Sequence, residues 1–136
     1  ANARLAYRLF EQVCDSSRWA ALSSQGARVQ RPLWASTSTK NPSYSDVLYV
    51  ESLIGPDTVN TMPPDTLRAF KDHGRVELTI NSEVDQALEL VSRLSEAQIS
   101  MDIVTQKLED EGVAAFFKSF DNLLAVIEGR RQSILG

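Results

Sequence analysis

Two short apolar runs constrain the fold of this chain most, each ending in small hydroxyl residues and followed within a few residues by a proline. The first is "RPLWAST" at 31–37, and the second is "DTVNTM" at 57–62. Both are continuous and too short for a helix, which predicts two buried strands. "DVLYVESLI" (46–54) between them and "PPDTLRAFKDHG" (63–74) after them predict helices. Strands that alternate with helices in this way indicate parallel βα units.

The last part of the chain reads as helical. "RVELTIN" at 75–81 is either a strand or an extended linker, and three helices are predicted after it. Ser82 is the expected cap of the first helix. Ser100 or Asp102 is the expected cap of the second, which we expect to end at Gly112. The third carries an apolar stripe, named here the phenylalanine stripe, which predicts a core or docking face. Its members are Val113, Phe116, Phe117, Phe120, Leu123, Leu124 and Ile127.

Two parallel strands are too few for a sheet that stands alone, because a parallel sheet is covered on both faces. The 136 residues therefore predict either a piece of a larger α/β fold or a mostly helical domain with a vestigial sheet. The periodicity of residues 2–15 predicts an amphipathic helix at the start of the chain. We expect this helix to be the crossover from a preceding strand, and the first alternative therefore fits better.

Composition excludes several classes of function. The net charge of −4 and the pI near 5.0 disfavour nucleic-acid binding, which needs a basic patch. No apolar run is long enough for a membrane span. One cysteine, Cys14, and one histidine, His73, are too few for an ordinary zinc site. We expect no metal, no nucleic acid and no membrane partner, and a cytoplasmic location.

The hydroxyl residues at 36–39 and the neighbouring Lys40 are the candidate binding group. Their hydroxyls, backbone N–H groups and ammonium suit a phosphate monoester. In (β/α) barrels, moreover, the reacting groups lie at the carboxyl ends of the strands. The alternative is a solvated Ser/Thr loop with a turn at 41–42. Lys40 is not expected to form a Schiff base, because a polar loop offers nothing that lowers its pKa. We interpret the "DHG" at 72–74 as a helix end rather than a catalytic Asp–His pair.

Two stretches carry a family resemblance: "ANARLAY" and "ARVQRPLWASTSTKNPSYSDVLYVESLIGPDTVNTMPPDTLRAFKDHG". They resemble the C-terminal part of bacterial transaldolases of the long type, which also occurs fused to phosphoglucose isomerase. The resemblance implies an α/β fold, the C-terminal portion of a circularly permuted class I aldolase (β/α)8 TIM barrel. Residues 1–74 would supply helix six and strands seven and eight with their helices. Residues 75–136 would form a C-terminal helical tail of the same domain, so that the chain is predominantly helical.

The resemblance also implies an activity. Transaldolases are transferases of the pentose phosphate pathway. They move a dihydroxyacetone unit from a ketose phosphate to an aldose phosphate through a Schiff base, without a metal or organic cofactor. The Schiff-base lysine and its acid–base partners would lie before Ala1. We therefore expect no catalytic residue in this chain and no activity of the chain alone.

The resemblance implies site roles for only a few residues of this chain. Ser36 aligns with a family phosphate-binding serine. Lys40, or else Ser38, stands where shorter transaldolases have an arginine, and lysine lacks the bidentate fork of that residue. Asn60 and Thr61, at the end of strand eight, are candidates to line the site. The expected partners are sugar phosphates and either a complementary N-terminal barrel segment or a second copy. The alternatives are a truncated, non-catalytic helical interaction module and part of a bifunctional transaldolase/phosphoglucose isomerase.

Overall fold

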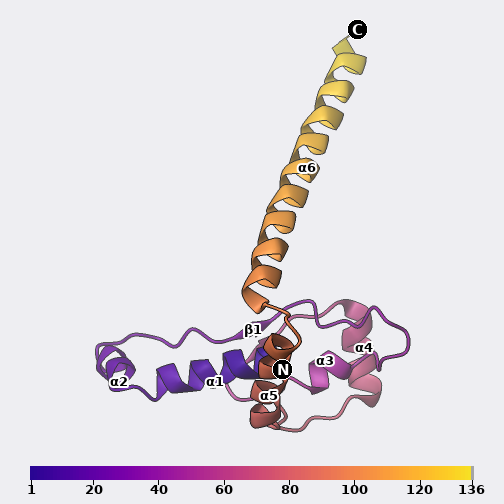
Figure 1. Ribbon diagram of the computed structural model, residues 1–136. Coiled ribbons are helices and arrows are strands. Elements are labelled where there is room, and N and C mark those ends of the chain that lie inside the picture. The colour runs from indigo at the N-terminus through magenta and orange to yellow at the C-terminus, as the bar shows by residue number, and fades with distance from the viewer. Residues whose placement is uncertain (136) are drawn as a thin grey trace. The chain divides into compact units, whose positions relative to one another are not determined.

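A computed structural model describes residues 1–135, and the chain divides into two compact units, Ala1–Val91 and Ser92–Gly136. Figure 1 shows the elements of both units along the chain, with β2 unlabelled. The first unit carries, in order, α1 (Asn2–Cys14), α2 (Ser17–Ser24), β1 (Leu33–Trp34), α3 (Leu48–Glu51), β2 (Val59–Asn60) and α4 (Pro64–His73). The predicted alternation of strand, helix, strand and helix in the middle of the chain is confirmed.

The two strands are parallel and directly paired, with Leu33 opposite Val59 and Trp34 opposite Asn60. The N–H of Val59 donates to the carbonyl of Pro32 at 2.9 Å, and the N–H of Thr61 donates to that of Trp34 at 2.9 Å. Both strands are shorter than their apolar runs. The first ends early because Ser36 has a φ of 57°, a left-handed conformation that turns the chain out of the extended direction.

Helix α2 has a capping residue at each end. The Ser16 hydroxyl oxygen accepts the N–H of Trp19 at 3.1 Å, which makes Ser16 the N-cap. Gly26 follows the helix with a φ of 91° and donates its N–H to Ser23, while the N–H of Ala27 donates to Leu22. This pair of bonds is a Schellman motif, and the left-handed backbone it needs favours glycine at this position.

The core of the first unit brings together residues from several elements. Its buried apolar side chains are Tyr7, Val47, Val50, Ile80 and Ala87. The segment 75–81 forms no helix or strand: residues 75–79 are irregular and residues 80–81 lie in a turn, so it is a linker rather than a strand. It is tied to the chain after α3, because the N–H groups of Thr79 and Ile80 both donate to the carbonyl of Ile54. Gly55 lies so close that a Cβ there would stand 2.2 Å from Ile80 Cγ2.

Two details of the helical tail differ from the prediction. Helix α5 (Val84–Glu96) is not capped by Ser82, whose hydroxyl donates to Thr79 O instead. The predicted break at Gly112 is wrong, because α6 runs unbroken from Met101 to Leu135. An interior glycine costs a helix only about 1 kcal/mol, and the residues around it are good helix formers.

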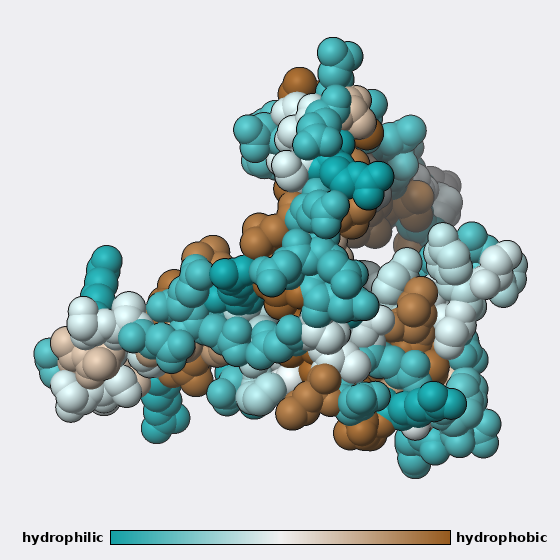
Figure 2. Space-filling model, turned by 60° about the horizontal axis from the view of Figure 1, so that its bottom comes forward, coloured by the Kyte–Doolittle hydropathy of each residue, from teal (hydrophilic) through white to brown (hydrophobic). Residues whose placement is uncertain are grey.

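The phenylalanine stripe is exposed in the second unit, and α6 buries none of its described residues. Phe116 is the most open of the stripe, with 81% of its surface exposed. Apolar residues also reach the surface elsewhere, and Figure 2 shows hydrophobic groups interspersed with polar ones on its visible face. Of the two predicted roles for the stripe, the docking face fits this exposure and the core does not. Over residues 1–135, no helix has the length and apolar character needed to cross a membrane.

Candidate functional site

The carboxyl ends of β1 and β2 meet through one buried hydroxyl. The Thr37 side chain is 3% exposed and donates to Asn60 Oδ1 at 2.8 Å. Its oxygen also lies 3.1 Å from the carbonyl oxygen of Thr61. The Thr61 hydroxyl in turn lies 3.3 Å from the carbonyl oxygen of Trp34. Thr37 therefore serves the structure: it fixes the chain after β1 to the end of β2 and has no proton left for a ligand.

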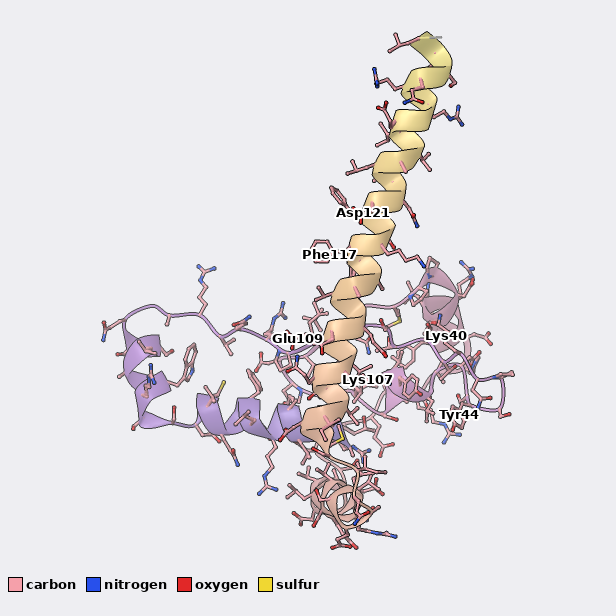
Figure 3. All side chains as sticks on the ribbon, turned by 45° about the horizontal axis from the view of Figure 1, so that its top comes forward. Lys40, Tyr44, Lys107, Glu109, Phe117 and Asp121 are labelled. Atoms are coloured by element: carbon pink, nitrogen blue, oxygen red, sulfur yellow. The ribbon has the colours of Figure 1, made fainter. Side chains whose placement is uncertain are left out.

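Residues 36–46, named here the hydroxyl loop, hold their shape through local hydrogen bonds. The Thr39 hydroxyl donates to Ser45 O at 3.2 Å and closes the loop. The N–H of Ser43 donates to Asn41 Oδ1 at 2.9 Å, and the N–H of Tyr44 donates to Asn41 O at 3.1 Å. This confirms the turn predicted at Asn41 and Pro42. Figure 3 shows the side chains of Lys40 and Tyr44 on this loop.

A cavity of about 300 Å³ lies between the hydroxyl loop and the first turn of α4. Ser38 and Lys40, two of the predicted site residues, both line it. Ser36, Asn60 and Thr61 are not part of this lining and lie at the strand ends instead, so their contact with a ligand stays a prediction. The full lining consists of Ser38, Thr39, Lys40, Asp46, Pro63, Asp65, Thr66 and Ala69.

Both carboxylates of the cavity have a nitrogen partner, a histidine for one and an arginine for the other. Asp46 Oδ1 lies 2.9 Å from His73 Nε2, and Asp65 pairs with Arg68 one turn further along α4. Lys40 is exposed and forms no ion pair with any residue of 1–135. Its ammonium therefore has no ion-pair partner among the residues that the structure describes. Its exposure also agrees with the prediction that Lys40 is not a Schiff-base lysine, since such a lysine needs burial or a cationic neighbour.

His73 makes a contact that the sequence did not reveal. It lies in the last turn of α4, as predicted, and its Nδ1 is 3.2 Å from Asp72 Oδ2. Its second nitrogen reaches Asp46, which lies 27 residues earlier in the chain. The hydrogen bonds to Asp46, and next to Asp72, raise the pKa of His73 above its ordinary value of 6.5. No local motif marks this pair, because α3, β2 and the rest of α4 lie between its members.

Comparison with known proteins identifies the family of the chain and leaves the site residues untested. A family model described as transaldolase/fructose-6-phosphate aldolase matches residues 1–127. "Transaldolase 2" of Nostoc sp. is 46% identical over 132 residues, which are 96% of this chain and 35% of that protein. "Transaldolase" of Mycolicibacterium smegmatis is 50% identical over 131 residues, again 96% of this chain and 35% of the relative. The chain thus spans about 35% of the length of these curated relatives.

Proposed function

Because the chain belongs to the transaldolase/fructose-6-phosphate aldolase family, we propose that it works as the C-terminal part of a bacterial-type transaldolase. In this role it contributes to the transfer of a dihydroxyacetone unit between sugar phosphates. The barrel segment that holds the Schiff-base lysine lies outside residues 1–136. The chain alone is then not an active transferase. A place in the cytoplasmic pentose phosphate pathway is part of the same proposal.

The contribution of this chain is to bind a substrate phosphate. The supporting observation is the charge pattern of the cavity beside the hydroxyl loop. Asp46 and Asp65 are each paired, which leaves Lys40 free to attract an anion. Ser38, in the same lining, adds a hydroxyl donor. Ser36 is the first residue of the hydroxyl loop and lies outside this lining, and its contact with the phosphate is a further part of the proposal.

The partner is a complementary N-terminal barrel segment. Strands β1 and β2 pair only with each other among residues 1–135, so each has one open edge. Leu33 on β1 and Leu9 and Val13 on α1 are more than half exposed. Open parallel edges and uncovered apolar side chains favour association with further strands and helices. In a (β/α)8 barrel, the preceding strands and helices would cover both.

Complementation tests this proposal. The chain would be co-produced with the Mycolicibacterium smegmatis transaldolase from which the matching 35% has been removed, named here the transaldolase remainder. We expect the pair to purify together and to transfer dihydroxyacetone from fructose 6-phosphate to an aldose phosphate. Neither polypeptide should do so alone. Activity of the chain by itself, with substrate trapped by borohydride on Lys40, Lys71, Lys107 or Lys118, would overturn the proposal that the nucleophile lies elsewhere.

A second candidate function is a non-catalytic helical interaction module, and the exposure of the phenylalanine stripe favours it. In that case the chain would self-associate, and the transaldolase remainder would not change its oligomeric state. Sedimentation of the chain with and without that remainder separates the two functions. Fusion to a phosphoglucose isomerase stays a prediction from the sequence resemblance.

A further inference from the structure

The carboxylate of Asp46 lies beside the cavity and also contacts the histidine at the end of α4. It lines the cavity beside the hydroxyl loop together with Lys40. Its Oδ1 also lies 2.9 Å from His73 Nε2 at the end of α4. The negative charge of Asp46, which would repel an anion in this cavity, thus lies next to the single histidine of the sequence. Asp65, the other carboxylate of the lining, is paired with Arg68, whose charge does not titrate near neutral pH.

The charged groups that face His73 come from two elements. Asp46 approaches from the hydroxyl loop before α3, and Asp72 comes from α4 itself, 3.2 Å from Nδ1. The chain after α4 is held to α3, because the N–H of Arg75 donates to Glu51 Oε1 at 2.8 Å. The C-terminal end of α4 also favours a positive charge at this place. The imidazole is therefore fixed on both nitrogens while its side chain stays 48% exposed.

We propose that His73 is a positioning residue for anion binding: as an imidazolium it holds Asp46 and cancels its charge, so that Lys40 determines the charge of the cavity. This inference rests on the proposed function, in which the cavity binds a substrate phosphate. It goes beyond that function because it makes the affinity for the phosphate depend on a residue that does not touch it. His73 acts through Asp46 and belongs to the binding machinery without contacting the ligand.

The direction of the effect is set by the charges. When His73 loses its proton, Asp46 keeps its negative charge beside the cavity and offsets Lys40. Affinity for an anion is then high at low pH and falls as the pH rises through the pKa of His73. That pKa lies above 6.5 because of Asp46 and Asp72. Since these groups are exposed, we expect about a two- to five-fold loss of affinity across the transition.

Sulfate is the appropriate probe, because it remains a dianion between about pH 5.5 and 8.5 while phosphate titrates within that range. The isotope-labelled full chain would be titrated with sulfate at constant ionic strength. The backbone amide signals of Thr39 and Lys40 would report binding, and the His73 ring signals would report protonation. We expect the affinity for sulfate to fall with the same midpoint as the titration of His73.

Three variants separate a charge effect from a structural one. His73→Gln keeps a donor for Asp46 without a charge, and should bind sulfate weakly at every pH. His73→Arg keeps the charge at every pH, and should bind tightly even at about pH 8.5. Asp72→Asn leaves the Asp46 pair intact but removes one neighbour that raises the pKa, so the midpoint should move to lower pH. Circular dichroism would show that each variant retains the helix content of the parent chain.

The outcomes distinguish this inference from the proposed function. If sulfate shifts the amides of Thr39 and Lys40 but His73→Gln keeps the pH profile of the parent chain, the role of His73 is overturned and the anion site stands. If His73→Arg also loses affinity at high pH, the charge of His73 is not the cause. If sulfate shifts neither amide, alone or after assembly with the transaldolase remainder, the phosphate site itself is overturned.

Discussion

The hydroxyl of Thr37, on the hydroxyl loop, donates to Asn60 Oδ1 at the end of β2, with 2.8 Å between the two oxygen atoms. Two residues that are 23 positions apart in the chain thereby join the loop after β1 to the end of β2. Because Thr37 is buried, its bond is shielded from competition with water, and its loss leaves the Asn60 oxygen unsatisfied.

The change Thr37→Val keeps the shape of this side chain and removes its donor. We expect the free energy of unfolding to fall by about 1–3 kcal/mol. Urea denaturation followed by circular dichroism would measure it. Thr39→Val is the matched control, because its hydroxyl bonds to Ser45 O in an exposed setting and should cost less. Equal losses of unfolding free energy in the two variants would show that the bond between Thr37 and Asn60 stabilises the fold no more than the exposed bond does.

Gly55 is required for space rather than for backbone freedom. A Cβ at this position would stand 2.2 Å from Ile80 Cγ2, and Ile80 is 1% exposed. Gly55→Ala should therefore lower the free energy of unfolding by about 1–3 kcal/mol through overpacking. The double variant with Ile80→Ala removes the clashing methyl group. If Gly55→Ala destabilises the Ile80→Ala background as much as the parent, the contact is not the cause.

Gly112 tests the continuity of α6. Nothing lies within 4 Å of a Cβ added there, and the residue is in the interior of the helix. Gly112→Ala should raise helix stability by about 0.5–1 kcal/mol, visible as a higher midpoint of thermal unfolding in the far-ultraviolet circular dichroism. A helix that ended at Gly112 in a left-handed turn would instead be destabilised by the same change. The sign of the change in the unfolding midpoint therefore distinguishes a continuous helix from one that ends at Gly112.

The ion pair of His73 predicts how stability depends on pH. The folded state raises the pKa of His73 above 6.5, so it binds the proton more tightly than the unfolded chain does. The stabilisation from this pair is fully present below 6.5 and is lost as the pH rises through the folded pKa. Urea midpoints of the parent chain and His73→Gln should differ at about pH 5.5 and converge at high pH. A difference that grew with pH would contradict this sign.

Lys40 should matter for binding but not for folding. It is exposed and has no ion pair among the described residues, so Lys40→Gln should change the free energy of unfolding by less than about 0.5 kcal/mol. The same change should abolish the sulfate-induced shift of the Thr39 amide, whereas Lys40→Arg should keep it. Undiminished binding by Lys40→Gln would assign the anion to other donors of the loop.

Local patterns predict much of this fold. The strand–helix order of residues 31–74 arises from short apolar runs, prolines and glycines, and Ser16 and Gly26 mark the ends of α2 through standard capping chemistry. The hydroxyl residues after β1 do lie at the carboxyl ends of the strand pair, while their binding of a ligand stays a prediction. These features depend on residues that are close together in the sequence, so they can be predicted without knowledge of the tertiary contacts.

The remaining features depend on tertiary contacts. The pairing of Asp46 with His73 needs the loop and α4 to come together across 27 residues. Thr37 looks like a ligand donor in the sequence, and only the position of Asn60 shows that its hydroxyl is already engaged. The continuity of α6 was missed for another reason, because a single glycine is a weak stop signal whose effect depends on the helix propensity of the residues after it.

The unbroken α6 changes the thermodynamics of anything that docks on the phenylalanine stripe. With 35 residues it is about 50 Å long, well beyond the roughly 12–15 residues at which a lone helix becomes marginal in water. Its backbone is ordered before it meets a partner, so association need not include a coil-to-helix transition. Such a preorganised ligand loses less entropy on binding than a disordered segment. A partner that docks on this stripe would therefore meet a helix that is already formed, and the affinity would carry little cost for ordering the backbone of α6.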